Sequence, residues 1–142
     1  MMRPGRPFAR SILSLRMTAA LCFLFLALPA CSPIAVSVKP DSGLTRTRTL
    51  RVFAEHGDPV GVKAKLEHLL VAKGFRLVTT PEEKADYALR FRYVFLDGFR
   101  TFSAMIVETS NNEVVAVGEL TGYRMDDGFL EEFVAKLADQ VR

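Results

Sequence analysis

The chain has 142 residues, a length that fits a single domain. Its 19 Lys and Arg outnumber its 16 Asp and Glu, but four of the basic residues precede an apolar run near the N-terminus and every acidic residue follows that run. Residues 31–142 therefore carry 15 basic and 16 acidic side chains, a net charge of −1, which removes the compositional support for a nucleic-acid-binding surface.

The first 30 residues have the features of a secretory signal peptide. Residues 1–16 are basic and contain no acid, and residues 17–30 form an apolar run of 14. A membrane-spanning helix needs about 20 apolar residues, so this run is short for a permanent span. A basic start, an apolar centre and a small residue at the end together predict a segment that is removed on export.

The end of this segment, Leu28-Pro29-Ala30-Cys31, resembles the lipobox of bacterial lipoproteins, although Pro29 departs from the usual residue at its position. The resemblance implies cleavage between Ala30 and Cys31, a diacylglycerol on the sulfur of Cys31 and acylation of the new amino group. Such chains hold a protein firmly on a membrane. The alternative is an ordinary signal peptide that happens to contain Cys31.

Ser32 indicates the location of the exported protein, and the two cysteines limit its chemistry. In lipoproteins of the enteric type, Ser at the position of Ser32 implies transfer to the outer membrane, facing the periplasm, and disfavours inner-membrane retention. Cys22 leaves with the signal peptide and Cys31 is acylated, so the exported domain has no free thiol. This excludes a disulfide and a thiolate metal site.

Residues 31–48 are expected to be the lipidated cysteine and a flexible tether. Residues 32–48 contain two Pro, one Gly and several Ser and Thr, without sustained periodicity. A flexible chain of this length spans about 20–25 Å, which would keep the domain near the bilayer. The alternation of Ile34, Val36 and Val38 leaves a short edge strand as the competing interpretation.

Regular patterns begin at residue 49, where the single domain of residues 49–142 is expected to start. Residues 50–54 predict a strand. Asp58-Pro59 is typical of a helix start, with Asp as N-cap and Pro in the first helical position. Gly74 is typical of the residue just after a helix. Residues 75–79 then predict a second strand, which Pro81 ends.

The clearest strand is predicted over residues 87–95, where apolar residues from Tyr87 to Phe95 alternate with polar ones. Asp97-Gly98 indicates a turn into a strand over 101–109, and residues 110–112 favour a tight hairpin. Residues 113–125 predict a further strand. Gly118 and Gly122 within it suggest a bulge or close packing under a helix.

A last helix is predicted after Gly128, with apolar residues from Phe129 to Val141 at helical spacing. The expected order is β-α-β-β-β-β-α. We therefore predict an α+β fold, a two-layer sandwich in which two helices cover one face of a mostly antiparallel sheet.

No pattern in the sequence predicts catalysis. The only histidines, His56 and His68, have no Cys, carboxylate or second His at ligand spacing, so neither a metal nor a cofactor is expected. The carboxylates near turns and helix starts are explained by turn chemistry and the helix dipole. These are Asp86, Asp97, Asp126, Asp127, Glu131 and Glu132. We therefore expect a protein that is not an enzyme.

The sheet face turned away from the helices is the candidate partner surface. Alternation places Arg90 and Arg92 on it, together with Val115, Val117 and Tyr123 from the last strand. A mixture of Val, Tyr and Arg is unusual for a face in contact only with water and is typical of an interface. The alternative is that another segment covers this face.

A family resemblance supports the same interpretation. The helix end Lys73-Gly74-Phe75, the break at Pro81 and the run 85–91 (ADYALRF) are similar to small outer-membrane lipoproteins of the curli-secretion and penicillin-binding-protein-activator type and to uncharacterised families around them. The resemblance covers residues 49–142 and carries over no functional residue. It implies a non-enzymatic envelope module that binds a protein or forms homo-oligomers.

Two other functions stay open at this point. One is a carrier or sensor of a small envelope ligand such as a lipid or glycan, which would need an apolar cavity between helices and sheet. The eleven Phe are compatible with it. The other is a hydrolase, which would need carboxylates or a Ser/His pair in one cleft.

Overall fold

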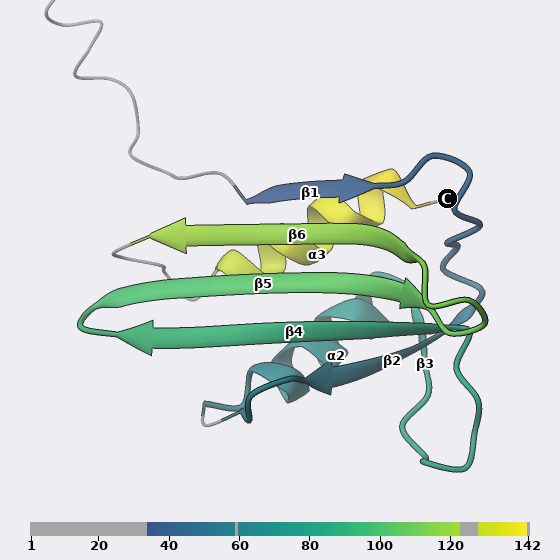
Figure 1. The fold of residues 1–142 in the computed structure, drawn as a ribbon, viewed down its shortest axis with the longest axis horizontal. Helices are drawn as coiled ribbons and strands as arrows, with labels where there is room; N and C mark the ends of the chain where they lie inside the picture. Colours follow the sequence, from purple (N-terminus) through teal and green to yellow (C-terminus); the bar gives the residue numbers. More distant parts are fainter. Residues whose placement is uncertain (1–33, 59, 123–127, 142) are drawn as a thin grey trace, which may run out of the picture. The chain divides into compact units, whose positions relative to one another are not determined.

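A six-stranded sheet backed by two helices accounts for most of residues 34–58, 60–122 and 128–141, the part of the chain that the computed structural model describes (Figure 1). The elements are β1 (Ala35–Val38), β2 (Thr49–Ala54), α2 (Val62–Ala72), β3 (Arg76–Leu77), β4 (Tyr87–Leu96), β5 (Phe99–Glu108), β6 (Val114–Gly122) and α3 (Phe129–Gln140). Neither helix has the length and apolar character that crossing a bilayer requires.

The strands lie in the order β1-β6-β5-β4-β2-β3. Strands β4, β5 and β6 form an antiparallel meander, whereas β2 pairs in parallel with both β3 and β4. Figure 1 shows α2 and α3 on the same face of this sheet. The predicted α+β sandwich with the order β-α-β-β-β-β-α is confirmed, with β1 added in front of it.

The core lies between the sheet and the two helices, as the period-two pattern of β4 predicts. Tyr87, Leu89 and Phe91 are fully buried, while Arg90 and Arg92 between and beyond them are exposed. The ring of Phe102 on β5 contacts two rings of α3 edge to face, at centroid distances of 5.3 Å to Phe129 and 5.2 Å to Phe133.

Gly118 lies where α3 packs closely on the sheet, as its place in the sequence suggested. A Cβ atom at this position would lie 2.8 Å from Cδ2 of Phe133 and closer still to Cε2. The absence of a side chain therefore makes room for the phenyl ring. Gly122 has no such neighbour, since no atom lies within 4 Å of the position that its Cβ would take.

Helix α2 begins later than the sequence predicted. Its first residue is Val62, with Gly61 at the N-cap position, and not Pro59, which lies outside the described residues. Asp58 nevertheless serves the helix start, because its carboxylate accepts hydrogen bonds from the amides of Val62 (2.7 Å) and Lys63 (2.8 Å). The predicted end is confirmed: Gly74 has a positive φ of 86°.

Residues 34–48 pack on the domain, so the flexible-tether interpretation does not hold for them and the edge-strand alternative is correct. β1 pairs with β6 from Ala35–Glu119 to Val38–Ala116. Ile34 is buried and its carbonyl accepts a hydrogen bond of 2.8 Å from Lys136 of α3. Pairing with a strand distant in the sequence orders this segment, which its own composition does not reveal.

The β4–β5 hairpin is longer than predicted and projects past β2, while β6 follows it as far as the pair Arg100–Gly122. Pairing between β2 and β4 ends at Ala54–Phe91, whereas β4 and β5 continue to the closing pair Leu96–Phe99. The predicted turn is confirmed, with positive φ at both Asp97 (48°) and Gly98 (79°). Phe95, which the alternation placed in the core, is 57% exposed because the strand has run beyond the helices.

Candidate functional site

The sheet face opposite the helices is the candidate site, and we call it the open face. The cross-strand register aligns one side chain from each of four strands on it: Phe53 is opposite Arg90, Arg90 opposite Met105, and Met105 opposite Val117. The residues that define the open face are Phe53, Arg90, Arg92, Val94, Met105, Val117 and Glu119.

Apolar side chains are more exposed on the open face than is usual for a solvated sheet. Val117 is 52% exposed, Phe53 is 43% exposed, and Val94 is exposed as well. An antiparallel sheet with one solvated face normally carries polar side chains there. Apolar area next to arginines matches the composition of protein interfaces.

The two arginines of β4, Arg90 and Arg92, differ from the arginine of β2. Within the described part of the chain, the side chain of neither forms a hydrogen bond or an ion pair, and both are exposed. Arg51, one strand away, instead donates to the carbonyl of Thr80 (2.6 Å) and to that of Glu83. Arg51 therefore holds the 79–86 loop, while Arg90 and Arg92 keep their donors available for another molecule.

A hollow of about 600 Å³ lies between this loop and the open face. Its lining includes Phe53, Ala88 and Arg90 of the sheet and Glu83 and Lys84 of the loop. The hollow thus combines an apolar floor with charges of both signs, and it extends the open face toward β2.

A polar cluster at the other end of β4 has a structural role. Nη1 of Arg48 donates to the hydroxyl of Tyr87 at 2.8 Å, and its guanidinium lies 4.9 Å from the centre of that ring. It also lies 3.5 Å from a carboxylate oxygen of Asp86 and 3.8 Å from one of Glu108. The cluster joins the loop before β2 to the start of β4 and the end of β5.

Asp86 and Tyr87 titrate unusually within this cluster. The amide of Thr49 donates to Asp86 at 2.8 Å and its hydroxyl at 2.9 Å, and these bonds, with Arg48, lower the pKa of the Asp86 carboxyl below its usual value. Burial raises the pKa of Tyr87. From the sequence, Asp86 was interpreted only as a turn residue, because its partners Thr49 and Arg48 lie 37 and 38 positions away.

The structure brings together three of the five residues predicted for the partner surface. Arg90, Arg92 and Val117 are exposed on the open face. Val115 is wrong: it is only 2% exposed and belongs to the core. A bulge between the pairs Ile106–Ala116 and Val107–Val114 leaves Val115 without a cross-strand partner and breaks the alternation. Tyr123, like Ala30 and Cys31, lies outside the described residues.

Side chains able to bind a metal ion do not gather in the described ranges. No group of three His, Cys, Asp or Glu side chains there could hold a metal ion. His56 is exposed in the loop after β2, and His68 is exposed on α2.

Comparison with known proteins gives the fold and no family. No protein-family model matches the chain, and no curated protein matches it either. Among solved structures, a point variant of the PelC dodecamer from Paraburkholderia phytofirmans is similar with a TM-score of 0.50 and 20% identity, over 77% of this chain and 98% of that one. The two chains share a fold.

Two further solved structures are more distant. The LpoB C-terminal domain from Salmonella enterica has a TM-score of 0.44 and 12% identity, over 58% of this chain and 87% of that one. The lipoprotein GNA1162 from Neisseria meningitidis has a TM-score of 0.43 and 14% identity, over 66% and 95%. Both scores are too low to establish a shared fold.

Proposed function

We propose that this chain is a lipid-anchored, non-catalytic module of the bacterial cell envelope that binds a protein partner through the open face. The observation that carries the proposal is the pair Arg90 and Arg92, exposed and without partners among the described residues, beside exposed Phe53 and Val117. Both described helices lie on the opposite side of the sheet, and no other described element covers this face (Figure 1).

The chemistry of the open face describes the surface that it would bind. The two guanidinium groups would bind carboxylates, with which arginine forms planar, bidentate ion pairs. The exposed Val and Phe side chains would contact apolar groups between those carboxylates. The partner is therefore a protein surface on which acidic and apolar side chains alternate. A second copy of this chain is one form of it, since the PelC chain that shares the fold is a dodecamer.

The anchor in this proposal is the lipid on Cys31, and Ser32 after it favours the outer membrane, facing the periplasm. Intact-mass measurement of the protein purified from cell membranes tests it. We expect the mass of residues 31–142 plus acyl chains, and the loss of acylation and of membrane retention in Cys31→Ala. A polypeptide that keeps residues 1–30 and carries no lipid would contradict the anchor.

A photo-reactive amino acid at the open face tests the partner surface. Val117 and Val71 are valines of similar exposure, 52% and 57%, on the sheet and on α2 respectively. We expect a specific cross-link in whole cells from position 117 and none from position 71. Equal cross-linking at both positions would contradict a partner on the open face.

Charge reversal provides the second arm of the same experiment. Arg90→Glu with Arg92→Glu should abolish the cross-link from position 117, because carboxylates on both sides repel. Arg76→Glu, on the edge strand β3, is the matched control and should leave it intact. The mass of the cross-linked product distinguishes a second copy of this chain from a different protein.

A small envelope ligand such as a lipid or glycan is the second candidate function. The core between helices and sheet offers it little room, because aromatic rings pack there and Phe133 takes up the space over Gly118. The hollow beside the 79–86 loop is the observation that favours it. A ligand that protects this loop from proteolysis, and that no longer does so in Arg90→Ala, would support this function over a protein partner.

A further inference from the structure

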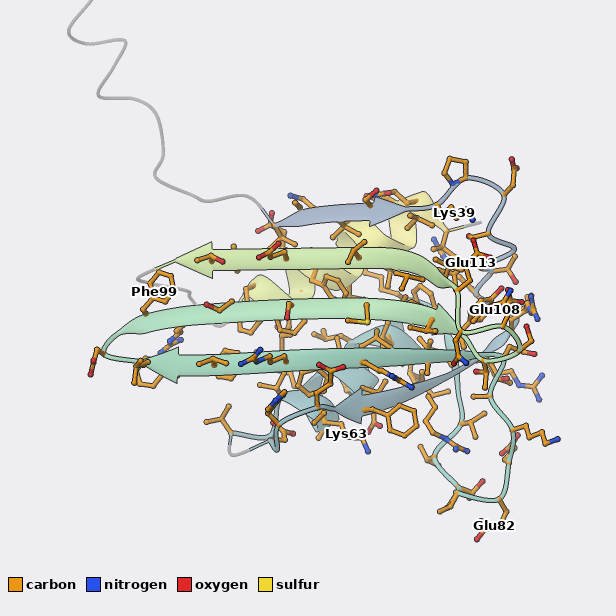
Figure 2. All side chains as sticks on the ribbon, viewed as in Figure 1. Lys39, Lys63, Glu82, Phe99, Glu108 and Glu113 are labelled. Atoms are coloured by element: carbon orange, nitrogen blue, oxygen red, sulfur yellow. The ribbon has the colours of Figure 1, made fainter. Side chains whose placement is uncertain are left out.

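The end of the sheet that carries the β4–β5 turn has a chemistry different from that of the open face. Leu96 is 66% exposed and Phe95 57%, and Phe99 is opposite Leu96 in the closing pair of the hairpin. Figure 2 shows Phe99 near this turn, with Glu108 and Glu113 at the opposite end of the sheet. We call residues 95–100, which follow the open-face residues Arg92 and Val94, the apolar tip.

The apolar tip has few charges. It contains one arginine, Arg100, and one acid, Asp97, and Arg92 of the open face borders it. The guanidinium of Arg100 lies 5.1 Å from the centre of the Phe95 ring. Aromatic and aliphatic side chains combined with arginine are typical of segments that enter the interface of a bilayer with anionic lipids.

The chain enters the domain at this same end of the sheet. β1 runs antiparallel to β6, and its first residue, Ala35, is opposite Glu119. Glu119 is in turn opposite Ser103, and Ser103 opposite Arg92. Ala35 is therefore level with Arg92 along the strand direction, and β1 begins at the end of the sheet that carries the apolar tip.

The lengths of these two segments agree. Four residues separate Arg92 from Leu96 on β4, a rise of about 13 Å at about 3.3 Å per residue. Four residues also separate Ala35 from Cys31, a reach of at most about 14 Å. The buried Ile34, bonded to Lys136, fixes the near end of this short connection. A lipid on Cys31 therefore cannot place the membrane much beyond the level of Leu96.

We propose that the apolar tip is a second membrane contact, in which Leu96, Phe95 and Phe99 enter the phospholipid interface and orient the domain on the bilayer. The inference rests on the lipid anchor proposed above. The anchor supplies attachment, and the apolar tip sets which end of the sheet faces the lipid. The open face then runs away from the membrane, accessible to a partner.

A single tryptophan tests this contact, because the chain contains none. The full-length acylated protein with Leu96→Trp is reconstituted in vesicles of phosphatidylethanolamine and phosphatidylglycerol whose acyl chains carry bromine, a quencher of tryptophan fluorescence. Ser110→Trp, in the exposed turn between β5 and β6 at the other end of the sheet, is the matched control. Phe99→Trp is a second reporter at the tip, and thermal unfolding establishes that each variant is folded.

We expect bromolipid to quench the tryptophan of Leu96→Trp about fivefold more than that of Ser110→Trp, since interfacial side chains reach about 5–10 Å into the boundary of headgroups and acyl chains. Acylated protein with equal or no quenching at both positions would overturn the second contact and leave the anchor standing. An intact mass without acyl chains would overturn the anchor and, with it, the inference that rests on it.

Discussion

The two faces of the sheet are made from the same strands and yet differ in the burial and the bonding of their side chains. On the helix side, side chains such as Phe102 and Phe133 interlock and are buried almost completely. On the open face, Phe53 and Val117 are half exposed, and the side chains of Arg90 and Arg92 make no bonds within the described residues. We therefore expect the first face to stabilise the fold and the second, to which we assign the partner, to contribute little stability.

Matched phenylalanines test this division with the largest expected effect. Phe133→Ala removes a ring from the core and should lower the free energy of unfolding by about 3–5 kcal/mol. Phe53→Ala on the open face should change it by about 0.5 kcal/mol or less. Urea denaturation followed by circular dichroism measures both. Similar losses for the two variants would mean that the open face also carries the stability of the fold.

Matched glycines sharpen the comparison within a single strand. Gly118→Ala places a methyl group against the ring of Phe133, and we expect it to cost about 1–3 kcal/mol of unfolding free energy. Gly122→Ala meets no atom within 4 Å and should have little effect. Thermal unfolding of the two variants and the parent protein gives the comparison. An unchanged melting temperature for Gly118→Ala would show that α3 does not pack as closely as described.

Acid sensitivity is expected to come from Asp86, the residue just before β4. Its folded pKa lies below its ordinary value of 3.8, so the stabilisation is fully present above that value and is lost as the pH falls through the lowered folded pKa. Asp86→Asn should cost about 1 kcal/mol at pH 7 through weaker hydrogen bonds to Thr49 and flatten this acid dependence. Urea melts between about pH 2, below the ordinary carboxyl pKa, and about pH 7, above it, measure both effects.

Substitutions of arginines are expected to change the unfolding free energy least, and they contrast open-face arginines with one that is bonded within the fold. Arg90→Ala with Arg92→Ala should leave the unfolding free energy within about 0.5 kcal/mol of the parent, because these side chains bond to nothing described. Arg46→Ala removes a 2.6 Å hydrogen bond to the carbonyl of Ala138 and should cost about 1 kcal/mol. A large loss of unfolding free energy in the double variant would show that Arg90 and Arg92 stabilise the fold and would weaken the binding proposal.

Local patterns predicted the regular elements well. The alternation from Tyr87 onward gave β4 and its buried face, and Asp97-Gly98 gave the hairpin turn, because both signals lie within a few residues. Gly74 likewise gave the end of α2. The open face followed from the same alternation, so Arg90, Arg92 and Val117 were assigned correctly to the exposed side.

Features that depend on distant partners were missed. Val115 is buried because a bulge shifts the register of β6 against β5, which the sequence of β6 alone does not reveal. β1 exists because β6 offers an edge, and Arg48 is held by Asp86 and Tyr87 from another part of the chain. Turn composition could not distinguish these ordered segments from a tether.

The pairing of β1 with β6 also determines when β1 can join the sheet. In a chain that is exported from its N-terminus, Ala35 emerges early, but its partner Glu119 belongs to the last strand to be delivered. Under the lipid anchor proposed above, residues 35–38 would therefore stay unpaired until β6 had crossed the membrane, and Cys31 would have to be processed while they were. Completion of the sheet would then pair them with β6 and order the chain from four residues after Cys31 onward.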